Sequence, residues 1–306
     1  MFCLDEKIRK KGTAVALGYF DGIHIGHKTV LQKALSAAKE NDLVPVVLVF
    51  DIHPRKLLSG NIPPMLTSEE RKREILTEMG FEIVAFNFRE AMNYSPSEFV
   101  EKILVRGLNA GAVSCGFDYH YGKGGKGNPD TLREELSKRD ILFFMSQPVS
   151  LDGDIVSSTQ IRKLITDGEI QKANAMLGDY FSYDFTVERG DGRGRVIGFP
   201  TINQFFPEDF VVPKFGVYMS LSKIDGKDYL SVTNVGTRPT VSKDSMRSET
   251  CILDYSGDLY GKKIQVQLVK YLREEKKFPD IEALTKAIGK DVENARKAYN
   301  EVKING

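Results

Sequence analysis

The segment GYFDGIHIGH, residues 18–27, decides the fold of the first half of the chain. A short apolar run, Thr13–Leu17, leads into it, and from His27 to Glu40 the apolar residues fall on one helical face. A buried strand that turns through glycines into a helix is typical of an alternating α/β fold. Ligands bind such folds beyond the strand ends, where the N–H groups of a helix N-terminus attract phosphate. The alternative is a glycine-rich turn with surface histidines, but two of the 4 histidines in the chain fall inside this one turn.

The same alternation continues to about residue 179. Further strands are expected at residues 43–50, 82–88, 112–115 and 141–145, and further helices at residues 68–79, 97–104 and 130–138. Strand–helix repetition of this kind predicts a parallel sheet with helices on both faces. We therefore expect a Rossmann-like α/β domain over residues 1–179.

The periodicity changes near Asp179 to alternating strands separated by turns. These strands are expected at residues 181–188, 216–222, 229–234, 249–254 and 263–271, with turns such as Ile224–Lys227 between them. Turn signals at this spacing favour an antiparallel β-barrel. A last helix is expected from Asp280 to about Val302, because its apolar residues form one stripe. We place this second, all-β domain at residues 180–306.

The composition is that of a folded globular protein with little net charge. Of the 306 residues, 41% are hydrophobic and 28% are charged, which argues against disorder. Lys and Arg number 43 against 42 Asp and Glu, so no bulk field points to nucleic acid or to an acidic membrane. Cys3, Cys115 and Cys251 are far apart and odd in number, which argues against a metal motif or a disulfide framework. With no apolar run near the ~20 residues that span a bilayer, we expect a cytoplasmic protein with small-molecule partners, of open oligomeric state.

A second motif, SSTQIR at residues 157–162, lies just before a predicted helix. One of its serines could serve as a helix N-cap, a role that is compatible with phosphate binding. The H-x-G-H arrangement that ends at His27 resembles the signature of the nucleotidyltransferase superfamily, and SSTQIR resembles the S-S/T-T-x-I-R motif of the same superfamily. The resemblance implies that the hydroxyls and the arginine of this motif embrace the phosphates of ATP. It also implies transfer of a nucleotidyl group with release of pyrophosphate.

Three side chains of these motifs are candidate catalytic groups. In-line attack of an acceptor phosphate on the α-phosphorus needs positioned donors and no covalent intermediate. His24, His27 and Arg162 have suitable donors. The other candidate ATP-binding residues of this site are Gly18, Phe20, Asp21, Gly22, Gly26, Ser157, Ser158 and Thr159.

The densest stretch after the predicted boundary is GDGRGRVIGFPTIN, residues 190–203. Its glycines supply backbone donors for phosphate, and its arginines add positive charge. Thr201 and Asn203 stand two apart in an extended segment, so their side chains point the same way and could share one Mg²⁺ through oxygen atoms. A barrel loop rich in turn residues would explain the glycines but not the P-T-x-N ending.

This stretch resembles the G-R-x-x-G-F-P-T-x-N hallmark of riboflavin kinases. Three later segments resemble the same family: NVGTRPT at residues 234–240, DLYG at 258–261 and REEKKF at 273–278. With these motifs following those of a nucleotidyltransferase, the chain resembles the bifunctional prokaryotic FAD synthetases from about Gly12 to the last helix. That resemblance implies that ATP phosphorylates riboflavin to FMN in the barrel. It implies further that a second ATP adenylylates FMN to FAD in the α/β domain.

The resemblance also implies roles for single residues. Glu249 would be the base that takes the proton from the ribityl 5′-hydroxyl, and Thr201 and Asn203 would bind Mg²⁺ with ATP. The glycine-rich stretch would cover ATP through Gly190, Gly192, Gly194, Arg195 and Gly198. The candidate flavin-binding residues are His53, Pro54, Asp118, Arg273 and Glu274.

Three positions depart from the family pattern. Cys251 stands where many members carry histidine, Tyr119 replaces a phenylalanine, and Ile52 replaces the first proline of F-x-P-H-P. None of them removes a group assigned to the chemistry, so they bear on substrate fit and rate.

Two other functions stay open. One is a nucleotidyltransferase for another phosphorylated acceptor, such as a pantetheine or nicotinamide ribotide, and the P-T-x-N segment argues against it. The other is a non-catalytic regulator that binds flavin or nucleotide, and the presence of Glu249, His24 and His27 argues against that.

Overall fold

The structure, a computed structural model, describes residues 5–50, 60, 62–190, 194, 197–238 and 245–305. The chain divides into two compact units: residues 1–63 with 69–157, and residues 64–68 with 158–306. Residues 158–179 group with the second unit, where Asn174 donates a hydrogen bond to the Leu268 carbonyl at 2.8 Å. The change of periodicity in the sequence predicts the domain boundary after residue 179. That the two activities divide at this residue stays a prediction. Each unit is described by itself.

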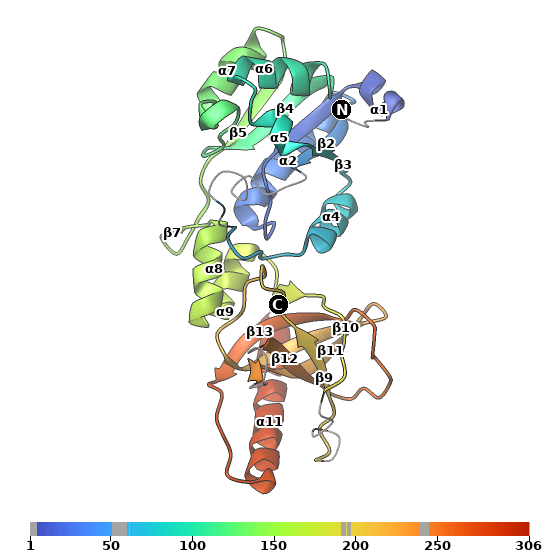
Figure 1. Ribbon diagram of the computed structural model, residues 1–306, viewed down its shortest axis with the longest axis vertical. Helices are drawn as coiled ribbons and strands as arrows, with labels where there is room; N and C mark the ends of the chain where they lie inside the picture. The colour runs from blue at the N-terminus through green and yellow to red at the C-terminus, as the bar shows by residue number, and fades with distance from the viewer. Residues whose placement is uncertain are drawn as a thin grey trace. The chain divides into compact units, whose positions relative to one another are not determined.

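The first unit is built on a five-stranded parallel sheet (Figure 1). Its strand order is β3-β2-β1-β4-β5, and every neighbouring pair runs parallel. The strands are β1 (Thr13–Leu17), β2 (Val44–Phe50), β3 (Glu82–Phe86), β4 (Ala110–Gly116) and β5 (Leu142–Ser146), followed by the short antiparallel pair β6 (Ser150–Leu151) and β7 (Asp154–Ile155). The helices are α1 (Glu6–Lys11), α2 (Ile25–Glu40), α4 (Glu69–Glu78), α5 (Phe88–Ala91), α6 (Pro96–Phe99), the π-helix η1 (Val100–Val105), the 3₁₀ turn η2 (Lys123–Gly125) and α7 (Pro129–Ser137).

Strand side chains pack into apolar cores on both faces of this sheet. Val15 and Leu17 of β1 join one core with Ile103, whereas Ala16, between them, joins the other core with Leu31 of α2. All five side chains are at most 1% exposed. Successive residues of a strand point to opposite faces, so an apolar run such as Thr13–Leu17 can serve two cores at once. The predicted parallel sheet with helices on both faces is confirmed.

The second unit is a curled antiparallel sheet with helices packed on it (Figure 1). Its strand order is β8-β13-β10-β11-β12-β9. The strands are β8 (Phe181–Tyr183), β9 (Thr201–Phe205), β10 (Gly216–Ile224), β11 (Lys227–Arg238), β12 (Ser245–Ile252) and β13 (Gln265–Arg273), and the helices are α8 (Ser158–Asp167), α9 (Ile170–Leu177) and α11 (Ile281–Asn305). The chain after β8 bridges the two sheet edges: the Val187 N–H donates to the Lys262 carbonyl and the Glu188 N–H to the Asn203 carbonyl, both at 2.9 Å. The predicted barrel-type sheet with a terminal helix is confirmed.

A row of buried hydroxyls crosses three neighbouring strands of this sheet, and we call it the hydroxyl ladder. Ser220 of β10 lies 2.7 Å from the Thr233 hydroxyl of β11, which lies 2.9 Å from the Thr250 hydroxyl of β12. None of the three side chains is exposed to solvent. Because buried hydroxyls need hydrogen-bond partners, the ladder specifies one register for these strands.

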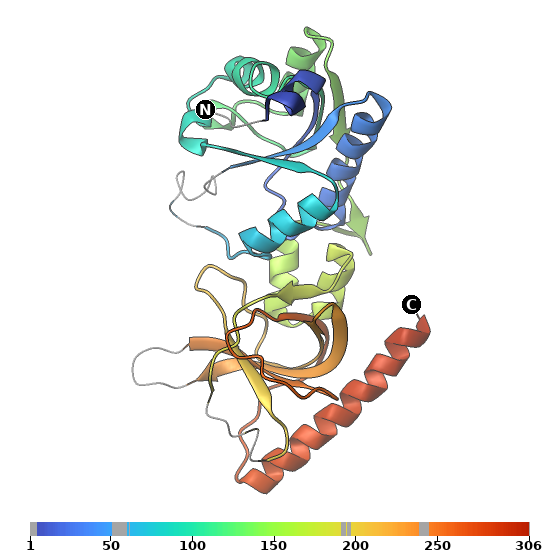
Figure 2. The same cartoon turned by 90° about the vertical axis from the view of Figure 1, so that its right-hand side faces the viewer.

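Helix α11 covers the opposite face of the sheet (Figure 2). Ala295 and Ala298 are buried against Val217 and Met219 of β10. Small alanines let the helix approach the strands closely, so α11 is an integral part of the second unit. Among the described residues, no helix is both long and apolar enough to cross a membrane.

The barrel strands differ in their bounds from the sequence-based expectation. The strand expected at residues 181–188 ends at Tyr183, and the strand expected at residues 229–234 runs from Lys227 to Arg238. The strand expected from Glu249 already begins at Ser245, and Thr201–Phe205, of which we expected only an extended segment, is the edge strand β9. Met246 is the one apolar residue among residues 245–248, so there is no apolar alternation, and pairing with β11 on one side and β9 on the other defines their conformation. Such pairings join residues far apart in sequence, where local periodicity carries no signal.

Candidate functional sites

The loop after β1 turns sharply before α2 begins. Phe20 and Ile23 have φ angles of 55° and 39°, and Gly22 has a φ of 81°. A Cβ atom on Gly18 would lie 2.8 Å from the Phe20 ring, so the loop requires glycine there. The Phe20 side chain is 1% exposed and anchors the loop in the core. Packing therefore holds this loop in a backbone conformation that residues other than glycine rarely adopt.

His24 caps helix α2 and stacks on His27. The His24 Nδ1 accepts a hydrogen bond from the His27 backbone N–H at 3.2 Å, and the two ring centroids are 3.6 Å apart. Because Nδ1 accepts, it carries no proton, so the proton of the neutral ring is on Nε2. The helix cap thus sets the tautomer of His24, and its ring donor is Nε2–H, the type of group that binds a phosphate oxygen.

The loop after β4 begins beside the loop after β1. Leu17 and Cys115 are paired near the ends of these neighbouring parallel strands, and the strand order reverses between them. Open α/β sheets bind their ligands at this switch point. Asp118 follows β4, and a Cβ atom on Gly116 would lie 3.0 Å from its Oδ1. The structure thus brings Asp118 and the His24–His27 loop to the same end of the sheet.

A thiol and a phenol near the end of β4, those of Cys115 and Tyr119, are harder to deprotonate because they are buried. Burial raises the pKa of the Cys115 thiol to about 12 and also raises the pKa of the Tyr119 hydroxyl. Both groups therefore stay protonated at neutral pH. Cys115 is a buried thiol without nucleophilic character, as its position in the apolar core indicates.

A buried lysine supports the first loop from helix α4. The Lys72 Nζ lies 2.7 Å from Glu69 Oε1 and 3.4 Å from the Tyr19 carbonyl oxygen, and it sits 4.1 Å from the centroid of the Tyr19 ring. The Tyr19 hydroxyl donates to the same Glu69 oxygen at 3.0 Å. Lys72, 2% exposed, thus fixes the residue that leads into the turn. Sequence reasoning missed Lys72 because it stands in a charged helix with no motif around it.

The SSTQIR segment links the two units. Ser157 ends the first unit, and Ser158 begins helix α8 of the second. Just before the segment, the Val156 carbonyl oxygen would lie 3.8 Å from a Cβ atom on Gly26, so the chain passes beside the histidine loop. The Arg162 Nε donates to the Pro64 carbonyl at 2.6 Å, inside the second unit. That Ser158, Thr159 and Arg162 join His24 and His27 around one ATP stays a prediction.

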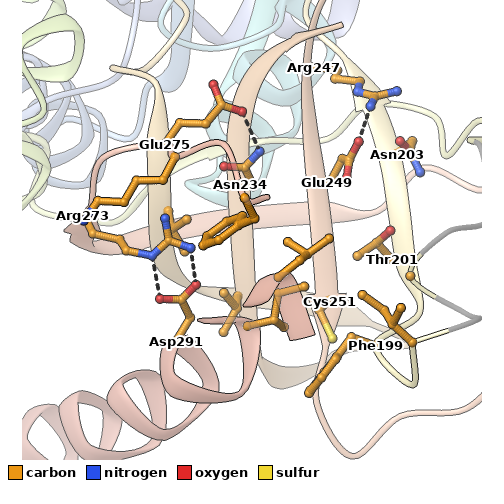
Figure 3. A pocket seen from close by; sticks show the side chains of 18 residues that line it. Phe199, Thr201, Asn203, Asn234, Arg247, Glu249, Cys251, Arg273, Glu275 and Asp291 are labelled. Atoms are coloured by element: carbon orange, nitrogen blue, oxygen red, sulfur yellow. Dashed lines mark hydrogen bonds and ion pairs between the residues drawn. The ribbon is translucent and has the colours of Figure 1, made fainter. Parts of the chain in front are cut away.

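A cavity of about 290 Å³ lies between the barrel sheet and α11 (Figure 3). Glu249 of β12 is paired directly with Asn203 of β9 on one side and with Asn234 of β11 on the other. Two residues further along β12, Cys251 is paired with Thr201. The side chains of these five residues all line the cavity. The structure therefore brings the candidate base and both candidate metal ligands together on one face of the sheet.

The other wall of the cavity is held by polar contacts (Figure 3). The Asn234 side chain donates to Glu275 Oε1 at 3.2 Å, and Arg273 forms an ion pair with Asp291 of α11. Arg273, a candidate flavin-binding residue, thus lines the cavity with its guanidinium already paired. Glu274 is not among the described residues that line the cavity, and its flavin contact stays a prediction.

Gly190 and Gly194 bring the backbone close to the candidate metal ligands. A Cβ atom on Gly190 would overlap the Asn203 amide, and one on Gly194 would lie 3.4 Å from Thr201 Oγ1. Gly198 has a φ of 82°. Only glycine allows this close approach and this backbone conformation. Gly192, Arg195, His53 and Pro54 lie outside the described residues.

Comparison with known proteins agrees with the two sites. Residues 6–160 match the family model described as FAD synthetase, and residues 177–299 match the model described as riboflavin kinase. The bifunctional riboflavin kinase/FMN adenylyltransferase of Listeria monocytogenes is 36% identical over 92% of this chain and 91% of its own length. The enzyme of the same description from Bacillus subtilis is 33% identical over 95% and 94%. This chain belongs to the bifunctional riboflavin kinase/FMN adenylyltransferase family.

A solved structure shares the fold of this bifunctional family member. It is described as a macrolide-efflux protein from Streptococcus pneumoniae and aligns with a TM-score of 0.83 at 28% identity. The alignment covers 93% of this chain and 94% of that one. The likeness therefore extends over both units.

The kinase-type cavity of this family member contains residues that no motif singled out. Arg247 and Asp291 line it, one from β12 and the other from α11. Arg247 stands two residues before Glu249, so alternation along the strand could have placed both on one face. Asp291 gave no such signal, because its partner Arg273 is in a different element.

Proposed function

We propose that the barrel unit phosphorylates riboflavin with ATP to give FMN and ADP, and that the α/β unit adenylylates FMN with a second ATP to give FAD and pyrophosphate. The observation that carries this proposal is the cross-strand pair of Glu249 and Asn203 inside one cavity. It sets a carboxylate beside neutral oxygen ligands, which is what transfer of a phosphoryl group to a hydroxyl needs.

Glu249 is the proposed base of the kinase step. Its side chain is 35% exposed, so a ligand in the cavity can reach it. As the ribityl 5′-oxygen forms its bond to the γ-phosphorus, the carboxylate takes the hydroxyl proton. The bond from the γ-phosphorus to the bridging oxygen breaks, and ADP leaves with the electron pair. A base positioned in this way contributes roughly 10²–10⁴ in rate.

Thr201 and Asn203 are suited to a Mg²⁺ ion that arrives with ATP. Their hydroxyl and amide oxygens are hard, uncharged donors on one face of β9, two residues apart. Mg²⁺ sites in phosphoryl-transfer enzymes take one or two protein ligands and fill the remaining positions with water and phosphate oxygens. Bound there, the ion would neutralise negative charge on the phosphates during transfer.

His24 and His27 are the proposed phosphate donors of the adenylylation step. An oxygen of the FMN phosphate bonds to the α-phosphorus of ATP while the bond to the bridging oxygen breaks, and pyrophosphate leaves. The attacking phosphate is already ionised, so the step needs no base. The Nε2–H of His24 and the first N–H groups of α2 would stabilise the charge that develops.

Two substitutions test this division of labour in the full chain. Glu249→Gln keeps the shape of the side chain but removes the base, so FMN formation from riboflavin should fall by roughly 10²–10⁴ while conversion of FMN to FAD is unchanged. His27→Ala should have the opposite effect. Chromatography of the flavins, with riboflavin and FMN supplied in separate assays, measures both steps.

Loss of both activities in both variants would contradict separate sites. Wild-type protein that binds flavin without converting riboflavin or FMN would favour the non-catalytic regulator instead. The cytoplasmic location, and partners limited to ATP, riboflavin and FMN, stay predictions from the sequence.

A further inference from the structure

Arg247 is the cationic side chain that meets the proposed base. It stands two residues before Glu249 on β12, and its Nη2 is ion-paired with Glu249 Oε1 (Figure 3). The Arg247 side chain is only 13% exposed. Arg273, the other arginine among the described residues that line the cavity, is paired with Asp291. Arg247 is therefore the guanidinium nearest to the proposed chemistry.

The kinase reaction brings the γ-phosphate of ATP to the same pair. The base must lie within about 3 Å of the attacking hydroxyl, and that oxygen starts about 3–3.5 Å from the γ-phosphorus. The phosphate oxygens therefore arrive within a few ångströms of the Glu249 carboxylate. A guanidinium that contacts this carboxylate is then within reach of the phosphate.

The cavity holds the carboxylate of Glu275 besides that of Glu249. The Glu275 carboxylate lies close to Gly236, since a Cβ atom on Gly236 would be 2.5 Å from Glu275 Oε1. Gly236 is paired with Arg247 across strands β11 and β12. Both carboxylates repel the γ-phosphate, Glu249 more strongly because Glu275 is exposed to water. Thr201 and Asn203 are uncharged. Of the cations among the described residues that line the cavity, Arg273 is paired with Asp291 and Lys276 is exposed, so Arg247, which contacts Glu249, is the one placed to offset this repulsion.

We propose that Arg247 exchanges partners during the kinase reaction: it holds Glu249 in the ligand-free enzyme and moves to the γ-phosphate when ATP binds. This inference rests on the proposed role of Glu249 as the base. A guanidinium offers several N–H donors in a planar fork and binds phosphate at two oxygens. The exchange has a chemical benefit, because a carboxylate that is no longer ion-paired accepts the ribityl proton more readily.

The exchange predicts that Arg247 distinguishes ATP from ADP. We would measure FMN formation by the full-length protein, with the β,γ-imido analogue of ATP and ADP as separate inhibitors competing with ATP. In Arg247→Met, the inhibition constant of the imido analogue should rise at least about tenfold, because a charge-assisted hydrogen bond is lost, whereas that of ADP stays within about twofold. The turnover number should fall as well, and Arg247→Lys should recover part of both losses.

A matched control comes from an arginine–carboxylate pair of the same unit outside the cavity. Arg296 lies 2.8 Å from Asp254 on the protein surface, and Arg296→Met should leave both inhibition constants unchanged. Inhibition constants that rise equally for ADP and the imido analogue in Arg247→Met would overturn the exchange. A turnover number that is unchanged or higher in this variant would overturn it as well. If Arg247→Met does not fold, Arg247→Gln and Arg247→Lys give the same comparison. Wild-type protein that makes no FMN would refute the proposed function itself, a different result from all of these.

Discussion

Arg273 and Asp291 form a two-pronged ion pair that ties strand β13 to helix α11. The Arg273 Nε lies 2.8 Å from Asp291 Oδ1, and its Nη2 lies 2.6 Å from Oδ2. The Asp291 side chain is 5% exposed, so the pair is largely shielded from water. Because it closes one wall of the kinase cavity, α11 belongs to the site as well as to the fold.

Removal of Asp291 should loosen this wall. Asp291→Ala leaves the Arg273 guanidinium partly buried without its carboxylate, so the free energy of unfolding should fall by about 3 kcal/mol, as measured by urea denaturation. The Michaelis constant for riboflavin should rise with it. Glu293→Ala, at an exposed position of the same helix, should change stability by less than about 0.5 kcal/mol. A similar loss in both variants would mean that the effect comes from the helix and not from the ion pair.

Asn203 should determine how much Mg²⁺ the kinase step needs. Asn203→Ala removes one of the two proposed oxygen ligands, so the Mg²⁺ concentration for half-maximal FMN formation should rise by roughly tenfold. Asn234→Ala is the matched control, because Asn234 flanks Glu249 on the other side and is hydrogen-bonded to Glu275. An unchanged Mg²⁺ titration in Asn203→Ala would exclude this residue as a ligand.

His24 has two roles that different substitutions should separate. Asparagine is a good N-cap, so His24→Asn should keep the stability of α2 but lose FAD formation from FMN. His24→Ala should lose FAD formation and also about 1 kcal/mol of stability, measured by urea denaturation. Full FAD formation in His24→Asn would show that the ring acts only as a cap.

The two buried cysteines should make stability fall at high pH. Burial raises the pKa of the Cys251 thiol from 9.0 to about 11, and that of Cys115 to about 12. The folded state therefore prefers the neutral thiol, and its advantage is complete below the ordinary pKa near 9.0. The advantage is lost as the pH rises from there toward 11. Urea denaturation at pH 8 and at pH 10.5 should show this loss, and it should be smaller in Cys251→Ala.

The sequence predicts the parts of this structure that depend on local patterns. The apolar run at residues 13–17 and the helical stripe after it predict β1 and α2, and the two sets of motifs predict the family, which the family models confirm. The glycines of the turn between β1 and α2 are also visible in the sequence: a side chain does not fit at Gly18, and Gly22 has a positive φ of 81°. These features need only neighbouring residues, so periodicity and composition are sufficient to find them.

Features that depend on distant partners could not be predicted in this way. Arg273 and Asp291 are in different elements, and the Lys72 contact with Tyr19 spans 53 residues. The H-x-G-H motif predicts phosphate binding for His24 but not that His24 also caps α2, because histidine is not a usual capping residue. The Arg273 and Lys72 contacts form only when distant elements pack together, whereas the His24 cap joins residues three apart.

The hydroxyl ladder separates two kinds of position along β12. Thr250 belongs to the ladder, whereas Arg247, Glu249 and Cys251 face the cavity from the other side of the strand. Substitutions at the odd-numbered positions can therefore adapt the chemistry, as the cysteine at position 251 illustrates, while the even-numbered positions keep the strand in place. An insertion of one residue before Glu249 would instead exchange the two faces of the strand. It would turn Glu249 toward the ladder and a hydroxyl toward ATP, so this strand can evolve by exchange of side chains but not by change of length.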